Sequence, residues 1–467
     1  MKTFYLLFVL ALFSGSLYSQ QKCKCEIALD NLSGLIERDY PGFKEKTKDS
    51  IAYKYFKSAL FDKAKKSDEK ECFQYLKNYI SYFRDGHVFF VDENSYLKTS
   101  KIEKIESLKT SEQLLRKVKT SKDSLEGIWK NEEFKVAIVK QKPQYYKGLV
   151  LESSNKNWKP GDVLFTLEGK QDLKLFDVKL RAFLDTYALE SASILHFNKT
   201  RNYFIKDNSD TLKTKDIENT VNRLLGFYVE KLTKETTLIK MKSFDYPFVE
   251  RIAKLIKDNT MLIRGSKNLI IDLRDNGGGT TDAFSPLLPY IMTGNLRSMG
   301  IEFWVSEFLI SGMEKYKNGL SSNVKNEAEQ KRIEMLLNYY KQNMGKFVLA
   351  PGANTISIDT VEQVENAVKQ VVFLTNKKIG SSAESFLLLA KQSKKVKLLG
   401  TPTHGVLDYA NAYLTGYEYE GHPLVLPTYR SLRLPDFPID NIGIQPDVYL
   451  DNGVKDWVSF AIAYLEN

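Results

Sequence analysis

Beyond its first residues, the 467-residue sequence has no apolar run long enough to span a membrane, and it contains only 13 prolines and 26 glycines. The first absence excludes a polytopic membrane protein, and the second excludes a long low-complexity linker. Hydrophobic residues (43%) and charged residues (27%) occur in the proportions of an ordinary globular protein. At this length, such a composition predicts about three domains.

Charge of one sign does not dominate any part of the sequence. Lysine and arginine number 68 against 58 aspartates and glutamates, a net charge of +10. The basic residues are mixed with acidic ones, as in residues 314–340, and no nucleic-acid-binding motif is present. We therefore expect a solvated, lysine-rich surface and no nucleic-acid partner.

Cysteine is scarce, with only Cys23, Cys25 and Cys72. No histidine stands at a metal-site spacing from them, so a zinc site lacks its fourth ligand. We expect structural cysteines, with Cys72 paired to either Cys23 or Cys25. This expectation fits an exported protein, because export favours disulfides.

Residues 1–19 have the pattern of a secretory signal peptide. Lys2 supplies a positive start, Phe4–Phe13 is an apolar stretch, and small residues follow up to Ser19. Such a peptide would direct the chain to the periplasm or the exterior and be cleaved after Ser19, so that no stable membrane insertion remains. A retained single anchor is the alternative interpretation.

Patterning divides the rest of the chain into three regions. Residues 20–124 are rich in helix formers and predict a helical domain, whereas residues 125–215 alternate short apolar runs with turns and predict a small β-rich domain. Residues 216–467 have α/β patterning, with a helical insertion at about 305–346. Two strand–helix–strand units are expected there, at Thr237–Met241, Phe248–Ile256 and Leu269–Leu273, and at Val371–Leu374, Ala383–Gln392 and Val396–Leu399.

The segment Asp272–Gly279 places three glycines soon after an apolar strand. Backbone N–H groups at the carboxyl end of such a strand can bind an anion or a developing oxyanion. A flexible turn is the alternative interpretation. A phosphate-binding loop would need a Gly-Lys-Ser/Thr sequence, which does not follow here.

The segment Gly380–Glu384 places a serine where a strand turns into a helix. A serine at a helix N-terminus can act as a nucleophile, because the positive end of the helix favours an anionic intermediate. The spacing from Ser381 to Glu384 also fits a capping box, with no catalytic role. Both roles can coexist if Ser382 caps the helix and Ser381 attacks.

A nucleophilic serine needs a base, and the chain has only four histidines. His196 lies among apolar residues of the β-rich region, and His422 follows Gly421 in a turn. His87 and His404 remain as equal candidates for the base.

These segments occur in the order of a known family. Taken together they resemble the tail-specific or C-terminal-processing serine peptidases of family S41, including the tricorn-like branch. The matching segments are Arg84-Asp85-Gly86-His87, Trp158-Lys159-Pro160-Gly161-Asp162, Leu269–Gly279, Gly380–Glu384, Gly400–Gly405 and Gly443–Asp447. The resemblance implies an α/β, mixed-sheet catalytic domain with βαβ units, preceded by a helical domain and a small β-rich, PDZ-like domain.

The resemblance also implies residue roles. Ser381 would be the nucleophile, and the N–H groups of Ser382 and of Gly277 or Gly278 would form the oxyanion hole. The processing branch uses a lysine at the position occupied here by Val406, so the serine–lysine mechanism is not expected.

The tricorn-like branch uses a histidine, which implies His87 as base, with His404 as the alternative. Asp440, or else Asp85, would orient its ring. The implied reaction is acyl transfer from peptide or protein substrates without a metal or organic cofactor. The alternative function is an inactive relative that binds peptides or small hydrophobic ligands. Nothing in the sequence indicates the oligomeric state.

Overall fold

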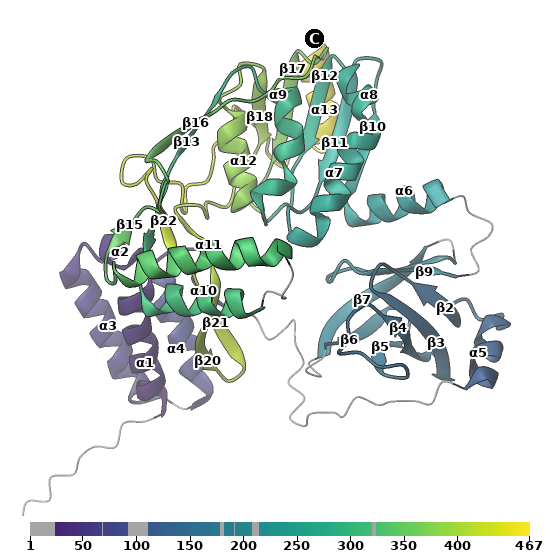
Figure 1. The fold of residues 1–467 in the computed structure, drawn as a ribbon, viewed down its shortest axis with the longest axis horizontal. Helices are drawn as coiled ribbons and strands as arrows, with labels where there is room; N and C mark the ends of the chain where they lie inside the picture. Colours follow the sequence, from purple (N-terminus) through teal and green to yellow (C-terminus); the bar gives the residue numbers. More distant parts are fainter. Residues whose placement is uncertain are drawn as a thin grey trace, which may run out of the picture.

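The computed structural model describes residues 24–67, 69–91, 111–177, 182–190, 192–207, 214–319, 324–365 and 367–467. In Figure 1 an α/β part lies above two neighbours, a group of N-terminal helices and a β-barrel. The predicted signal peptide and Cys23 lie outside the described residues.

The N-terminal part consists of helices packed on their apolar faces. Leu29, Leu32 and Ile36, which recur at helical spacing in the first helix, are fully buried. A disulfide joins Cys25 to Cys72, so Cys25 is the partner of Cys72 and ties the first helix to the fourth. The helices are α1 (Lys24–Asp39), α2 (Phe43–Lys46), α3 (Ser50–Ala64) and α4 (Glu69–Ser81).

The second part is a closed β-barrel whose strands pair in chain order, with the last strand pairing back to the first. Aromatic side chains fill its interior, among them Trp129, Phe165 and Phe197. A short helix, α5 (Glu112–Lys119), packs outside it. The strands are β2 (Gly127–Lys130), β3 (Phe134–Lys142), β4 (Tyr145–Ser153), β5 (Val163–Glu168), β6 (Asp172–Phe176), β7 (Ala182–Glu190), β8 (Ile194–Phe197) and β9 (Tyr203–Lys206).

A six-stranded sheet forms the core of the third part, in the order β10-β11-β12-β17-β18-β23. All neighbours in it run parallel except the edge strand β10. Both predicted strand–helix–strand units are confirmed. Their elements are β11 (Thr236–Met241), α7 (Val249–Asp258), α8 (Thr260–Arg264), β12 (Asn268–Asp272), β17 (Gln370–Thr375), α12 (Ser382–Ala390) and β18 (Val396–Gly400).

Apolar side chains cover both faces of this sheet. One cluster joins it to the helices α7 and α12, and a second joins it to the C-terminal helix. Burial on both faces explains why the central strand segments are continuously apolar. The flanking elements are α6 (Thr214–Leu225), β10 (Phe227–Lys231), η2 (Tyr246–Phe248), η3 (Thr281–Ala283), η4 (Ser285–Leu287), α9 (Leu288–Ile291), β23 (Val448–Tyr449) and α13 (Trp457–Glu466).

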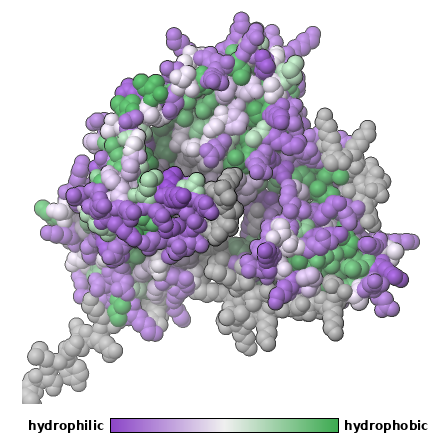
Figure 2. All heavy atoms as spheres, in the orientation of Figure 1, coloured by the Kyte–Doolittle hydropathy of each residue, from purple (hydrophilic) through white to green (hydrophobic). Residues whose placement is uncertain are grey.

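The region predicted as a helical insertion contains two packed helices, α10 (Glu307–Gly319) and α11 (Val324–Lys341). They lie between the N-terminal helices and the sheet in Figure 1, and the surface over α11 is mostly hydrophilic in Figure 2. The remaining strands are β1 (Phe89–Phe90), β13 (Leu296–Met299), β14 (Ile301–Trp304), β15 (Phe347–Val348), β16 (Ile356–Asp359), β19 (Tyr409–Ala410), β20 (Tyr413–Tyr419), β21 (His422–Leu426) and β22 (Tyr429–Ser431).

Strand pairing brings the N-terminal part to the catalytic candidates. β1 follows Arg84–His87 and pairs antiparallel with β21 of the C-terminal part, Phe89 facing Val425 and Phe90 facing Leu424. This pairing joins residues more than 300 positions apart in the sequence. Within the described ranges, no helix is long and apolar enough to cross a membrane.

Candidate active site

The nucleophile turn and the glycine-rich turn meet at one edge of the sheet. β12 and β17 are parallel neighbours, so the turns that follow them emerge side by side. A Cβ built on Gly278 would lie 2.8 Å from the Cβ of Ser381 and 3.0 Å from the backbone nitrogen of Ser382. Only a residue without a side chain fits here, because Gly278 also has φ +100.

Ser381 has an unusual backbone conformation, with φ 54 and ψ −127 at the N-terminus of α12. Non-glycine residues rarely adopt positive φ, and such strain concentrates at functional turns. The side chain is half-buried, so its hydroxyl is not sealed in the core. The helix N-terminus behind it favours negative charge at this position.

Two of the three predicted oxyanion donors remain available in this geometry. The N–H of Gly278 donates to Asn276 Oδ1 at 3.0 Å. Gly277 is exposed, and its N–H makes no hydrogen bond with another described residue. Ser382 is the first residue of α12, so its N–H lacks a partner within the helix. Gly277 and Ser382 therefore carry the free amides beside Ser381.

Glu384 is the hydrogen-bonding centre of the site. Its fully buried carboxylate accepts four hydrogen bonds. The donors are the Ser381 N–H (3.2 Å), the Val406 N–H (2.9 Å), the Gly405 N–H (2.7 Å) and the Thr403 hydroxyl (2.5 Å). One side chain thus fastens the nucleophile turn to the loop that contains His404.

That loop lies between the nucleophile turn and the N-terminal part. The Val406 side chain contacts both, since a Cβ on Gly380 would lie 2.8 Å from its Cγ2 and a Cβ on Gly86 would lie 2.1 Å from its Cγ1. His404 is exposed, with Cε1 3.6 Å from that Gly86 position. An apolar side chain, and not an amine, therefore lies between the nucleophile turn and the Gly86 turn.

The predicted base His87 lies in the turn that packs against Val406. Asp85 holds this turn, because its Oδ1 accepts the His87 N–H at 2.8 Å and its Oδ2 accepts the Tyr40 hydroxyl at 2.8 Å. Burial raises the pKa of Asp85 above its ordinary value. The Nδ1 of His87 is buried and has no hydrogen-bond partner among the described residues.

Asp440 lies in the same buried cluster. Its Oδ1 accepts the N–H groups of Leu407 and Asp408, both at 2.9 Å. Its Oδ2 is buried without a hydrogen bond among the described residues and lies 3.9 Å from Lys46 Nζ. Burial, followed by the charges of Asp85 and Asp408, raises the pKa of Asp440 to about 8.

The structure thus brings Ser381, His404 and the turn of His87 into one region, but neither imidazole is hydrogen-bonded to the Ser381 hydroxyl. A hydrogen bond between His87 and Asp440 is also absent among the described residues. The other two histidines are not placed at the Ser381 turn, although His422 lines a cavity beside the His87 turn. His196 is on barrel strand β8, and the ring of His422 on β21 stacks on Phe73.

Sequence reasoning missed two residues that organise this site. Glu384 was interpreted only as part of a capping box, although its four donors make it the link between two loops. Tyr40, 45 positions before Asp85, gave no local signal. The sequence does contain a signal for Glu384, since it is an acidic residue in the otherwise apolar first turn of a helix. A carboxylate buried in such a place needs hydrogen-bond partners.

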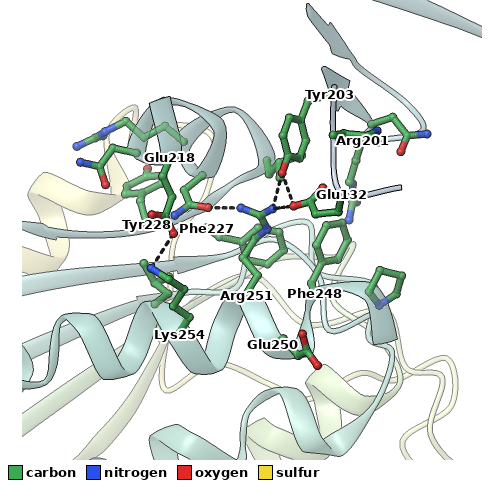
Figure 3. Close-up of a pocket in the computed structure, with 18 of the residues that line it drawn as sticks. Glu132, Arg201, Tyr203, Glu218, Phe227, Tyr228, Phe248, Glu250, Arg251 and Lys254 are labelled. Atoms are coloured by element: carbon green, nitrogen blue, oxygen red, sulfur yellow. Dashed lines mark hydrogen bonds and ion pairs between the residues drawn. The ribbon is translucent and has the colours of Figure 1, made fainter. Parts of the chain in front are cut away.

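A cavity of about 1540 Å³ lies away from this site, between the barrel and helices α6 and α7. Figure 3 shows Arg251 of α7 reaching Glu132 and Tyr203 of the barrel region. Asn222 of α6 accepts a further hydrogen bond from Arg251. The contact holds the barrel against the α/β part. No group of residues suited to a metal ion occurs within the described ranges.

Comparison with known proteins gives a family assignment. The model of Peptidase family S41 matches residues 235–300 and 304–450, which include the glycine-rich turn, Ser381 and Asp440. No curated protein matches the sequence.

Among solved structures, mature CPAF complexed with lactacystin is 12% identical with a TM-score of 0.48, covering 95% of this chain and 97% of that one. A putative peptidase from Parabacteroides merdae is 11% identical (TM-score 0.39, 95% and 97%). The tricorn protease is 12% identical (TM-score 0.39, 95% and 37%). These low scores carry no residue roles over to this chain. By the family match, the α/β part of the chain at residues 235–300 and 304–450 is similar to peptidase family S41, a family of serine peptidases.

Proposed function

We propose that this protein hydrolyses peptide bonds through an acyl-enzyme on Ser381. The observation that carries the proposal is the strained Ser381 turn, packed against Gly278 with the amides of Gly277 and Ser382 beside it. Amides that are fixed before the reaction stabilise the negative charge that develops on the carbonyl oxygen.

The reaction proceeds in two steps. The Ser381 oxygen bonds to the scissile carbonyl carbon while its proton passes to a histidine, and the N–H groups of Gly277 and Ser382 hold the oxyanion. The C–N bond then breaks, and the leaving amine takes the proton from the imidazolium. Water, activated by the same histidine, attacks the ester and releases the acid and free Ser381.

His87 is the proposed base, and His404 is the alternative. Asp85 supports His87, since it fixes the backbone of the histidine turn and is itself held by Tyr40. Asp440 is the proposed orienting carboxylate. Its Oδ2 and the Nδ1 of His87 are both buried without a hydrogen-bond partner among the described residues, and the proposal pairs these two atoms during the reaction.

A second candidate function is a non-catalytic peptide binder of the same fold. Val406 in place of an amine and the absence of a serine–histidine hydrogen bond favour it. We further propose export by residues 1–19, supported by the disulfide between Cys25 and Cys72. We also propose that the barrel takes the place of a PDZ domain.

A fluorophosphonate probe tests the catalytic proposal, because it reacts only with an activated serine. We expect labelling of the full chain to disappear in Ser381→Ala and to persist in the control Ser285→Ala, whose serine is exposed. Labelling should fall at least about 100-fold in His87→Ala and less than threefold in His404→Ala. The reverse order would make His404 the base, and an unlabelled wild-type chain would favour the binder.

A further inference from the structure

A second cavity, of about 670 Å³, opens beside the His87 turn and is not used by the chemistry described above. Its walls come from helix α4, the turn and strand at residues 84–90, the loop at 404–406, and single residues of two C-terminal segments. This volume lies within the range of about 300–1,000 Å³ that is typical of ligand pockets. It is large enough for a side chain together with neighbouring backbone.

The cavity is lined by apolar side chains that the fold leaves accessible. Phe89 on β1 is 42% exposed, although Phe90 beside it is buried. Phe73 is half-buried, packs edge-on against Phe90 and stacks on His422. An exposed phenylalanine on a fixed strand costs solvation free energy, which contact with an apolar ligand would recover.

One side chain separates this cavity from the nucleophile turn. Val406 lines the cavity, and its Cγ2 would lie 2.8 Å from a Cβ on Gly380, the residue before Ser381. His404 also lines the cavity, with its Cβ 3.8 Å from the same position. A peptide held with its scissile carbonyl at Ser381 would thus pass this opening within one or two residues of that bond.

The rim of the cavity is positively charged. Lys77 and Arg84 are exposed, and the Arg84 guanidinium makes no hydrogen bond or ion pair with another described residue. Lys77 lies 4.9 Å from the centroid of the Phe73 ring. Asp85 is the acidic lining residue, but it is buried and already accepts two hydrogen bonds. An acidic group on the ligand would complement the two cations.

We infer that this cavity binds an aromatic or large aliphatic side chain of the peptide substrate, with an adjacent acidic side chain at Lys77 and Arg84. The inference rests on the proposed peptidase function, because it takes the peptide at Ser381 as its starting point. It makes Phe89 and Arg84 specificity-determining residues rather than catalytic ones.

The test uses peptides acetylated and amidated at their ends, so that no terminal carboxylate is present. A library digested by the full chain and mapped by mass spectrometry should show Phe or Leu at one fixed place within two residues of the cut, beside Asp or Glu. For single peptides, Phe89→Ala should lower kcat/KM at least tenfold with Phe at that place and less than twofold with Ala. Phe89→Leu should recover most of the loss, and Met261→Ala, another exposed apolar residue, should change neither.

A charge test and a binding test complete the design. The preference is the ratio of kcat/KM for a peptide with Glu beside the apolar residue to kcat/KM for the same peptide with Gln there. Arg84→Gln should lower this ratio at least threefold. In Ser381→Ala, anisotropy of a fluorescent Phe–Glu peptide should show binding that Phe89→Ala weakens at least fivefold.

The outcomes separate the two proposals. The inference is overturned, and the peptidase proposal stands, if wild-type Ser381 is labelled but cleavage shows no preference for Phe or Leu beside an acidic residue. The same holds if Phe89→Ala lowers kcat/KM equally for the Phe and Ala peptides. Binding that depends on Phe89 without any labelling supports the pocket and refutes the peptidase. Absence of both binding and cleavage for every peptide overturns the inference as well.

Discussion

Replacing Glu384 by glutamine tests the interpretation that one carboxylate joins the nucleophile turn to the His404 loop. The Oε1 atom accepts from Thr403 and Gly405, and the Oε2 atom accepts from Ser381 and Val406. A glutamine NH₂ in the Oε2 position would face two N–H donors, and in the Oε1 position it would face the Gly405 N–H and require the Thr403 hydroxyl to accept instead of donate. In either case two charge-assisted hydrogen bonds would be lost. At about 1.5–3 kcal/mol each, the free energy of unfolding should fall by about 3–6 kcal/mol.

Guanidinium chloride unfolding of full-length Glu384→Gln measures this loss. The control is Glu362→Gln, at an exposed position, for which we expect a change within about 0.5 kcal/mol. Glu384→Asp retains the charge but is shorter by one methylene, so it should fall between the two. The fluorophosphonate labelling rate of Ser381 should drop at least about tenfold in Glu384→Gln, which corresponds to about 1.4 kcal/mol. Unchanged unfolding and labelling in this variant would refute the role assigned to Glu384.

Three further predictions concern the turns, the acidic cluster and the disulfide. Gly278→Ala should abolish probe labelling and lower the free energy of unfolding by more than about 1 kcal/mol. Gly277→Ala, which has open space around it, should have neither effect. Probe labelling and thermal unfolding measure both variants. Because the pKa of Asp440 is raised to about 8 in the folded state, its contribution to stability is full below about pH 4 and is lost as the pH rises through about 8. The Tm of Asp440→Asn should therefore change less between pH 5 and pH 8.5 than that of the wild type, and parallel curves would contradict the shift. Reduction of Cys25–Cys72, which are 47 residues apart, should lower the free energy of unfolding by up to about 4 kcal/mol in a denaturant titration with and without reductant.

Local patterning carried most of the secondary structure. The apolar segments at Thr237–Met241 and Leu269–Leu273 became strands β11 and β12, because a strand buried on both faces must be continuously apolar. The helical insertion was equally readable from its composition and length. Cys72 had two possible partners in the sequence, and only the position of α1 against α4 selected Cys25.

The sequence predicted the candidate site only in part. Ser381 and the glycines follow strands, so short-range rules place them at the carboxyl edge of the sheet. No rule of spacing could show that the Gly278 amide is used by Asn276, since that depends on the bend of the turn itself. The link from Tyr40 to Asp85 spans 45 residues and depends on helix packing.

The sequence alone determined which strands and helices form, because hydrophobic periodicity and turn residues act over a few positions, and it determined the order of the segments typical of family S41. Tertiary structure decided which distant groups meet. It packed Val406 between Gly86 and Gly380 and brought four hydrogen-bond donors to Glu384. It also paired β1 with β21, which places Phe89 in the wall of the cavity beside the His87 turn. Such contacts depend on the packing of whole elements, in which a shift of one residue would exchange a buried group for an exposed one.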